Sequence, residues 1–387
     1  MQWRVPLSDL NFGPEETAAV SEVIRSGWLS MGSVTQTFEA EFEAFVGASH
    51  AMAVTNATAA LHLACLACRL GLGDEVILPS LTFVASANAV RYTGAAPVFV
   101  DIESEDWLSI SPAAVETAIT QRTKAIMVVH YAGYPCDMPA ILEIARQNNL
   151  VVIEDASHAV GATLDERHLG TWGDIGCYSF FANKNMTTAE GGMLVTDNDQ
   201  LAEKVRVLRS HGMTTLTWDR HRGHASTYDV VDLGYNYRID ELRSALGRVQ
   251  LSKVLDGNRR RGELVELYRQ KLAEQAPHIS VPFTQMRGRS SYHIMPILLP
   301  EGWDKLSFMA AMKDKGIQTS WHYPPVHTFS SYAKDMDLLI SNLPLTEALA
   351  AREVTLPLYP SMTEEQVGWV VEALVHSSKL FADEHNL

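Results

Sequence analysis

Cysteine is scarce in this chain, with four in 387 residues. Cys65 and Cys68 form a CxxC pair, but no second pair follows at the spacing of a zinc site. The pair lies among leucine and alanine residues in a helix-like run, residues 61–70. We therefore interpret both cysteines as part of a buried helix face, and we expect no metal site.

Long hydrophobic runs are also absent. No stretch approaches the roughly 18 apolar residues of a membrane-spanning helix. The first six residues lack the charged and then apolar pattern of a signal peptide. We therefore expect a cytoplasmic protein that has no membrane partner.

Basic residues are in the minority: the chain has 31 lysines and arginines but 46 aspartates and glutamates, which gives a net charge of -15. This excess of negative charge repels a phosphate backbone, so we do not expect nucleic acid as a partner. It leaves room for one local basic pocket that binds an anionic small molecule. At 387 residues the chain is long enough for a large domain and a smaller one.

Short apolar runs alternate with helix-like segments up to about residue 250. The runs are uninterrupted and mostly β-branched, which is typical of strands buried on both faces of a parallel sheet. The expected strands are residues 51–54, 75–78, 96–100, 124–129 and 151–153, and the expected helices are residues 61–70, 85–92, 112–120 and 138–148. This order predicts an α/β fold with a mostly parallel central sheet and right-handed crossovers.

The pattern changes after residue 250. A long charged helix is expected over residues 251–275, followed by short strands around residues 292–299 and a helix over residues 307–315. The sequence thus predicts a large α/β domain, residues 1–250, and a smaller C-terminal α+β domain, residues 251–387.

One lysine stands apart in a polar, glycine-rich loop. Lys184 is the only lysine between Lys124 and Lys204, and it lies in the segment SFFANKNMTTAEGG, residues 179–192. About thirty residues upstream, an apolar run ends at Asp155. Separately, such a lysine is most often a solvated surface charge and such an aspartate a cap or turn former. Together they suit pyridoxal phosphate, which needs a lysine for its Schiff base and a carboxylate beside its pyridine nitrogen.

A third segment adds a place for the phosphate. The sequence TNATAAL, residues 55–61, follows a strand-like run and opens a helix-like one. Small and hydroxyl residues at such a turn let backbone N–H groups and the helix dipole approach a phosphate. Thr58, Asp155 and Phe83 all follow strand-like runs. Ligands collect at the carboxyl ends of parallel strands, so we expect these three residues to share one cleft.

At this point the sequence resembles a known group, the fold type I pyridoxal-phosphate enzymes, and within them the DegT–StrS family of nucleotide-sugar aminotransferases. The resemblance covers almost the whole chain in six ordered blocks. They are GDEVILPSLTFVA at 73–85, GAAPVFVD at 94–101, EDASHA at 154–159, the loop at 179–192, GYNYRIDE at 234–241 and WHYPPVH at 321–327.

The resemblance implies roles for the residues around the cofactor ring. Lys184 would be the catalytic lysine that bonds to the cofactor and moves a proton, which requires a depressed pKa. Asp155 would pair with the pyridine nitrogen, and His158 would contact the 3-hydroxyl group, although a packed histidine is the alternative. Phe83 would lie over the ring, since an aromatic face stacks without competing hydrogen bonds.

The resemblance also implies roles at the two ends of the site. Thr58, the backbone of Ala59, and Ser179 would hold the phosphate. Asn236 would reach the phosphate in the neighbouring subunit of a homodimer with shared active sites, whereas the residues alone favour an ordinary turn there.

Four residues are candidates for substrate binding. His322 and Tyr323 would face the sugar, and Trp28 and Arg238 would lie at the nucleotide end. A packed tryptophan and a surface arginine in an ion pair are the alternatives for the last two.

Two positions depart from the family pattern, which usually has glycine at Ala57 and at Ala189. Each change adds only a methyl group. Relatives that dehydrate sugars carry histidine at the position of Lys184, so the lysine favours amino transfer. The resemblance implies transfer from L-glutamate to a nucleotide-linked keto-sugar, at C-4 of a 4-keto-6-deoxyhexose, for a surface polysaccharide or a glycosylated natural product. The alternatives are an aminotransferase for a ring ketone such as a keto-inositol, and an inactive regulatory protein that binds the cofactor.

Overall fold

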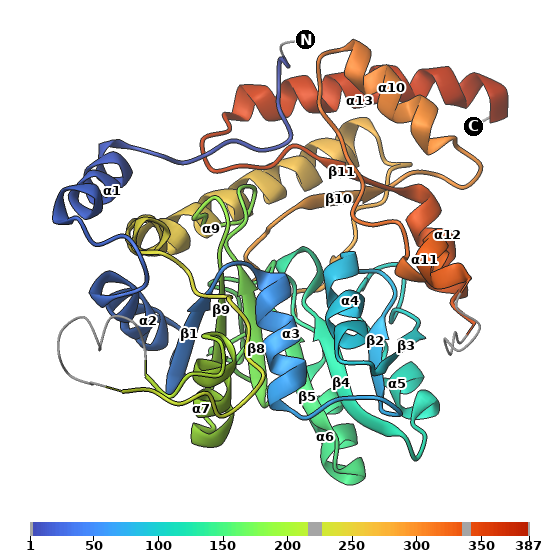
Figure 1. The fold of residues 1–387 in the computed structure, drawn as a ribbon. Coiled ribbons are helices and arrows are strands. Elements are labelled where there is room, and N and C mark those ends of the chain that lie inside the picture. Colours follow the sequence, from blue (N-terminus) through green and yellow to red (C-terminus); the bar gives the residue numbers. More distant parts are fainter. Residues whose placement is uncertain (1–2, 216–226, 335–341, 386–387) are drawn as a thin grey trace.

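The computed structural model describes residues 3–215, 227–334 and 342–385, and Figure 1 shows how they are arranged. A seven-stranded sheet in the order β1-β9-β8-β5-β4-β2-β3 forms its centre. The strands are β1 (His50–Val54), β2 (Glu75–Pro79), β3 (Ala96–Val100), β4 (Thr123–Val129), β5 (Val151–Asp155), β8 (Ile175–Ser179) and β9 (Gly192–Thr196). β9 runs antiparallel to both of its neighbours, and the other pairs are parallel. The predicted α/β fold with a mostly parallel sheet is confirmed.

Both faces of this sheet are buried, as the uninterrupted apolar runs predicted. Alternate residues of a strand point to opposite faces, and two separate cores use this alternation. Val76 and Leu78 pack in the core on one face, whereas Ile77 between them packs on the other. The same division separates Met127 from Val128 in β4.

Helices cover the two faces of the sheet. On one face lie α3 (Ala57–Ala67), α4 (Val84–Tyr92) and α7 (Asp199–Leu208). α3 contacts both α4 and α7, and all three contact strands of the sheet. On the other lie α5 (Pro112–Ala118) and α6 (Met138–Asn148). The four helices and five strands expected in this part of the chain are all present, and no end shifts by more than four residues. β8 and β9, which the sequence analysis did not identify, complete the sheet.

The CxxC pair lies on α3 as predicted. Cys65 is fully buried within the core on the α3 face of the sheet, and Cys68 follows at the end of the helix, packed against the same core. Both thiols are free. Burial raises the pKa of the Cys68 thiol to about 12, so neither the packing nor the protonation state favours redox chemistry at this pair.

A second unit follows along the chain and lies above the sheet in Figure 1. It contains the antiparallel strand pair of β10 (Met295–Leu298) and β11 (Glu353–Leu356), with α10 (Lys305–Asp314), α12 (Pro344–Arg352) and α13 (Glu364–His385). Its core also includes Val5 from the start of the chain. The remaining elements are α1 (Pro14–Ser26), α2 (Ser33–Val46), η1 (Tyr131–Gly133), β6 (Thr163–Leu164), β7 (Arg167–His168), η2 (Val326–Thr328) and α11 (Ser330–Ala333).

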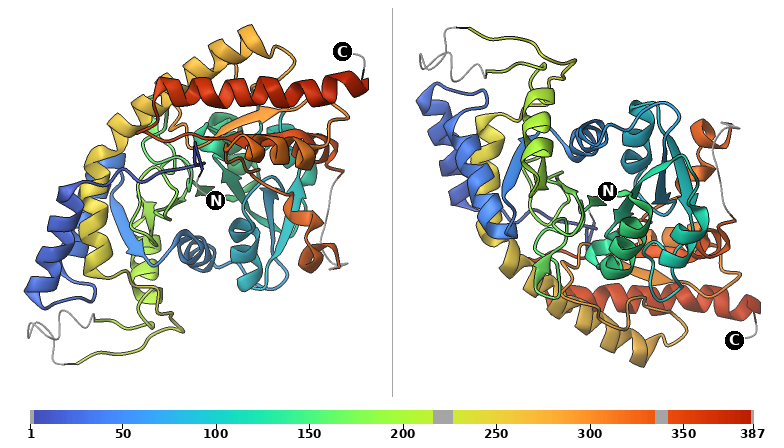
Figure 2. Two further views of the ribbon diagram at one scale, coloured as in Figure 1. Left: turned by 90° about the horizontal axis from the view of Figure 1, so that it is seen from above. Right: turned by 90° about the horizontal axis from the view of Figure 1, so that it is seen from below.

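The long helix α9 begins earlier than predicted. It covers Glu241–Gln275, so its start lies ten residues before the expected position, residue 251. The reason is a cap at its first turn, where the Asp240 side chain accepts a hydrogen bond from the N–H of Arg243. Figure 2 shows α9 running from α1 and α2 to α13, which it contacts near its far end. The boundary proposed at residue 250 thus falls inside one continuous helix, and the division into two domains stays a prediction.

Two buried carboxylates fix α1 and α2 against α9. Glu241 is 2% exposed and accepts hydrogen bonds from the N–H groups of Gly32, Val34 and Thr35 at the start of α2, each at 2.8 Å. Because four N–H groups at a helix start lack partners within the helix, this carboxylate caps α2 from another helix.

Glu16 in α1 is the second of these carboxylates. Burial opposes its ionisation, but hydrogen bonds from Lys253, Gly13 and Gln250 outweigh burial and lower its pKa to about 2. The ionised side chain therefore joins α1 to α9.

Within the residues described, no helix is long and apolar enough to cross a membrane.

Candidate active site

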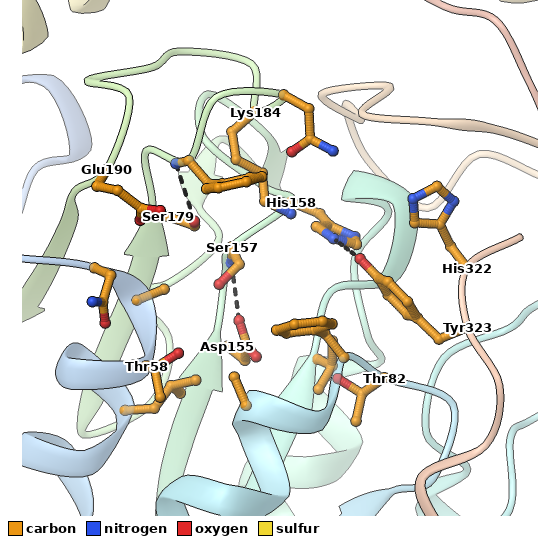
Figure 3. A pocket seen from close by; sticks show the side chains of 18 residues that line it. Thr58, Thr82, Asp155, Ser157, His158, Ser179, Lys184, Glu190, His322 and Tyr323 are labelled. Atoms are coloured by element: carbon orange, nitrogen blue, oxygen red, sulfur yellow. Dashed lines mark hydrogen bonds between the residues drawn. The ribbon is translucent and has the colours of Figure 1, made fainter. Parts of the chain in front are cut away.

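A cavity of about 440 Å³ opens at the carboxyl ends of the parallel strands. Its walls come from the turn before α3, the start of α4, the ends of β4, β5 and β8, the loop after β8, and one segment of the C-terminal unit. In Figure 3, Thr58 lies on one side of the cavity and His322 and Tyr323 on the other, with Asp155 between them. The lining residues are Asn56, Ala57, Thr58, Leu61, Thr82, Phe83, Ala85, Val129, Asp155, Ser157, His158, Ser179, Phe181, Asn183, Lys184, Glu190, His322 and Tyr323.

The structure therefore brings together eight of the twelve predicted site residues. The predicted shared cleft of Thr58, Phe83 and Asp155 is confirmed. His158, Ser179, Lys184, His322 and Tyr323 line the same cavity.

Asp155 is the last residue of β5 and is 5% exposed. One oxygen accepts a hydrogen bond from Ser86 Oγ at 2.7 Å and the other from the N–H of Ser157 at 3.1 Å. A carboxylate oxygen accepts more than one hydrogen bond. Asp155 is thus held rigidly with acceptor capacity left for a donor in the cavity.

Lys184 lies in the loop between β8 and β9 and is half-buried. Burial lowers its pKa to about 8, against a smaller opposing effect of the Asp155 charge. Its amine lies 3.4 Å from Nε2 of His293, a buried histidine of the C-terminal unit. A lysine with a pKa near 8 is partly neutral near physiological pH, as a nucleophile for an aldehyde requires.

The proton of His158 can be placed from its partners. Nδ1 accepts a hydrogen bond from the N–H of Ala132 at 3.2 Å, so the proton of the neutral ring is on Nε2. Burial and the positive charge of Lys184 lower the pKa of His158 well below its usual value, which keeps the ring neutral. Nε2 lies 2.9 Å from the Tyr323 hydroxyl, which therefore accepts and keeps its own O–H for another partner. Since both ring nitrogens have partners, the hydroxyl of Tyr323 is the group of this pair that is available to the cavity.

His322 is fixed in a similar manner. The hydroxyl of Thr355 donates to Glu353 at 2.6 Å, so it accepts from Nδ1–H of His322 at 2.8 Å. This arrangement leaves Nε2 of His322 as an acceptor. Burial, with a smaller effect from Lys184, lowers the pKa of His322 to about 3. His322 is therefore neutral at physiological pH.

The turn that leads into α3 offers a site for an anion. Asn56 caps the helix by accepting a hydrogen bond from the N–H of Ala59 at 2.8 Å. Thr58 and Ala57 in the first turn line the cavity, and Ser179 faces them from β8. Gly192 of β9 lets this turn pack closely against the strand, since a Cβ at Gly192 would lie 2.6 Å from the backbone carbonyl carbon of Asn56. Free N–H groups and the helix dipole at this end attract negative charge.

The other four predicted residues lie elsewhere. The N–H of Ala59 is already bonded to Asn56, and Ala59 does not line the cavity. Asn236 is exposed and forms a β-bridge with Ser210, and Arg238 donates a hydrogen bond to the hydroxyl of the same serine. Trp28 lies between α1 and α2, with its indole beside Gly32. Within the described part of a single chain, the structure does not bring these residues to the cavity, and their roles stay predictions.

The sequence analysis missed several residues of the site. Glu190 and Thr82 line the cavity, and Ser86 orients Asp155 from behind. His293 contacts Lys184 although the two are 109 positions apart. Serine and threonine are common in turns, and a histidine in a strand-like region carries no spacing signal, so only the fold reveals these contacts.

The residues present fit pyridoxal phosphate. An anion site at the start of α3, a rigid carboxylate at the end of β5 and a lysine of lowered pKa meet in one cavity. When bound, the cofactor supplies an electron sink and a temporary carrier for an amino group. Phe83 is 56% exposed at the mouth of the cavity, 5.7 Å from the Tyr323 ring, where an aromatic face is available for stacking. The fold and the site thus define an aminotransferase of the fold type I class that depends on pyridoxal phosphate.

Comparison with known proteins identifies the family. A sequence profile of the DegT/DnrJ/EryC1/StrS aminotransferase family matches residues 11–375, so the chain belongs to this family. The spore coat polysaccharide biosynthesis protein SpsC of Bacillus subtilis (strain 168) is 43% identical over 375 residues, which are 96% of this chain and 96% of that protein. The resemblance expected from the sequence is confirmed, and the chain is a sugar aminotransferase.

Solved structures of two proteins support this conclusion. PseC of Helicobacter pylori, an aminotransferase involved in the biosynthesis of pseudoaminic acid, matches with a TM-score of 0.90 and 28% identity over 98% of this chain and 100% of that chain. Spr1654 of Streptococcus pneumoniae in its pyridoxamine phosphate form matches with a TM-score of 0.90 and 27% identity over 97% of this chain and 100% of that chain. Its pyridoxal phosphate form has also been solved, and it matches with a TM-score of 0.89.

Proposed function

We propose that this aminotransferase transfers the amino group of L-glutamate to C-4 of a nucleotide-linked 4-keto-6-deoxyhexose. The observation that carries the proposal is the position of Lys184 in the same cavity as Asp155, His322 and Tyr323. A sugar that enters beside His322 and Tyr323 reaches the side of the cavity that contains Lys184. SpsC, named for spore coat polysaccharide biosynthesis, and PseC, named for pseudoaminic acid, support a product that enters a surface polysaccharide or a glycosylated natural product.

The polar groups of the cavity suit a sugar. Nε2 of His322 is an acceptor and the Tyr323 hydroxyl is a donor, so the two can bind neighbouring hydroxyl groups in opposite senses. Glu190 adds a carboxylate at the cavity wall, where it can accept a hydrogen bond from an ammonium or a hydroxyl group. We also propose a homodimer with shared active sites, in which Asn236 of one chain reaches the cofactor phosphate in the site of its neighbour. Trp28 and Arg238 are proposed to lie at the nucleotide end of the substrate.

The reaction divides into two halves at one site. L-Glutamate leaves as 2-oxoglutarate before the keto-sugar enters, which predicts ping-pong kinetics. Lys184 is the group of this chain that removes a proton from the donor carbon and returns one to the sugar carbon.

The first test is an absorption spectrum of the protein with pyridoxal phosphate, before and after L-glutamate is added. Loss of the visible band of the lysine-bound cofactor, with formation of 2-oxoglutarate, is the expected result. A band that L-glutamate leaves unchanged contradicts the proposed donor. The acceptor is tested by adding dTDP-, UDP- and GDP-linked keto-sugars to the aminated enzyme and following return of the band.

A ring ketone such as a keto-inositol is the other acceptor to test. A nucleoside diphosphate that raises the melting temperature supports the nucleotide-linked sugar, because a ligand stabilises the folded state to which it binds. No shift with any nucleotide, together with turnover of a keto-inositol, would contradict the proposed acceptor while the proposed donor stands.

A further inference from the structure

A chain of hydrogen bonds connects Lys184 to the long helix α9. Asn258 of α9 is 6% exposed and donates from Nδ2 to the carbonyl oxygen of Val160 at 2.8 Å. Its Oδ1 accepts from Nδ2 of Asn185 at 2.7 Å, and the same Nδ2 donates to the carbonyl oxygen of Ser291 at 2.7 Å. Because a carbonyl oxygen only accepts hydrogen bonds, the carbonyl groups of Val160 and Ser291 fix which side-chain atom is Nδ2 in Asn258 and Asn185, respectively.

These orientations determine the tautomer of His293. Asn185 uses its Nδ2 group for Asn258 and Ser291, so its Oδ1 is the atom that faces Nδ1 of His293 at 2.9 Å. An amide oxygen cannot donate, and Nδ1 of His293 must therefore carry the proton. Nε2 is then an unprotonated acceptor, and it lies 3.4 Å from Nζ of Lys184.

The surroundings of His293 keep its ring neutral. The ring is 5% exposed, and burial lowers its pKa well below the usual value. The positive charges of Lys184 and Arg261 act in the same direction, as would those of His158 and His322 if these rings were protonated. His158 stacks at a tilt with its ring centroid 4.3 Å away. A proton shared between Lys184 and His293 therefore belongs to the lysine.

We propose that His293 is a positioning residue that holds the amine of Lys184 whenever that amine is not bonded to the cofactor, with Asn185 and Asn258 fixing the tautomer that accepts. This inference rests on the proposed catalytic role of Lys184. The side chain of Lys184 has four flexible carbons, so its amine can adopt many rotamers once it is released from the cofactor. A hydrogen-bond acceptor at one fixed place, Nε2 of His293, restricts these rotamers. The acceptor also stabilises the ammonium form relative to the amine, so His293 opposes the effect of burial on Lys184.

The test measures Lys184 in the protein freed of cofactor. Acetylation of Lys184 by acetic anhydride is followed by mass spectrometry across a pH series, and the midpoint of the labelling rate gives the lysine pKa. His293→Leu removes the acceptor, and we expect the midpoint to fall by about one pH unit, as for one lost hydrogen bond to a charged donor. In His293→Gln the amide oxygen can still accept a hydrogen bond from Lys184, so the labelling midpoint should stay closer to that of the unmodified protein.

The matched control is His62→Leu. His62 is another buried histidine, 4% exposed, but its partner is the Tyr237 hydroxyl and not Lys184. We expect no shift of the labelling midpoint in this variant. An unchanged midpoint in His293→Leu would refute the proposal. A raised midpoint would refute it too, since it would mean that His293 carries a positive charge.

A second measurement uses the unmodified sequence and does not depend on whether a variant folds. In protein with ¹⁵N-labelled histidine, we expect His293 to show a protonated Nδ1 and a bare Nε2, with no titration between about pH 6 and pH 9. A proton on Nε2, or a titration within this range, overturns the proposal. Neither measurement uses a substrate. A failure to transaminate keto-sugars would thus contradict the proposed function and leave this inference standing.

Discussion

Replacement of Asp155 by asparagine separates the charge of this side chain from its shape. Asp155→Asn keeps the size of the group at the end of β5. The amide oxygen can still accept from the N–H of Ser157, and the Ser86 hydroxyl can turn to accept from the new amide, since Phe83 offers its carbonyl oxygen to that hydroxyl at 3.3 Å. We therefore expect the variant to fold and to lose only the negative charge in the cavity.

The expected effect follows from one interaction. A hydrogen bond with a charged partner contributes about 1.5–3 kcal/mol, whereas a neutral one contributes about 1 kcal/mol. At about 1.4 kcal/mol for each factor of ten, complete loss of the bond between Asp155 and the pyridine nitrogen corresponds to roughly 10- to 150-fold weaker cofactor binding. Turnover should fall further, because the pyridine nitrogen no longer stays protonated.

Two assays check this expectation. The first is a titration of the cofactor-free protein with pyridoxal phosphate. The second is the labelling midpoint of Lys184, which should be lower in the variant than in the unmodified protein, because the Asp155 charge raises the pKa of the lysine. Ser86→Ala is the control, since it removes a hydrogen bond to Asp155 and keeps the charge. Cofactor affinity, turnover and labelling midpoint all equal to those of the unmodified protein would refute the assignment of Asp155.

Four further predictions concern catalysis and stability. Lys184→Ala should bind pyridoxal phosphate without the visible band of the lysine-bound form and lose turnover; a normal band and rate would contradict the role of Lys184. Glu241→Gln leaves one acceptor oxygen for the N–H groups that open α2, so urea unfolding should show a loss of about 2–4 kcal/mol, and an unchanged midpoint would disprove the cap. Ala189→Gly should raise the unfolding free energy by about 1 kcal/mol, because Ala189 has a φ of 68° in the left-handed region, and a loss of stability would contradict this reasoning. Glu16 has a folded pKa of about 2 against 4.5, so its contribution of up to about 3 kcal/mol is complete above pH 4.5 and is lost as pH falls toward 2; Glu16→Gln should flatten that part of the pH–stability curve, and a curve of unchanged slope would refute the assignment.

Prediction from the sequence succeeded where the signal was local. The runs that became β2, β3, β4 and β5 were recognisable because a strand buried on both faces is apolar at every position. The start of α9 was misjudged because the segment before residue 251 is polar on several positions, and the cap at Asp240 that begins the helix was not recognised. β9 was missed, and its place in the sheet depends on antiparallel pairing not only with the neighbouring β8 but also with β1, which lies far away in the chain.

The same difference between local signals and contacts of distant segments applies to the active site. Lys184 and Asp155 were correctly expected in one cavity because the cofactor chemistry needs those two residue types, and the chain offers a single lysine in the right kind of loop. Their roles in the reaction stay predictions. The tautomers of His158, His322 and His293 could not be predicted, since each depends on partners that are distant in sequence, such as Ala132, Thr355 or Asn185.

By itself, the sequence determined the fold class and the cofactor, because periodicity, residue type and the ordered blocks shared with a known family carry that information along the chain. It also singled out Lys184 as the catalytic lysine, a role that stays a prediction. The tertiary structure alone decided which polar groups meet in the cavity and in which protonation state. Burial and hydrogen-bond partners set those states, and partners such as Tyr323 and Thr355 are present only because the C-terminal unit packs over the carboxyl ends of the strands.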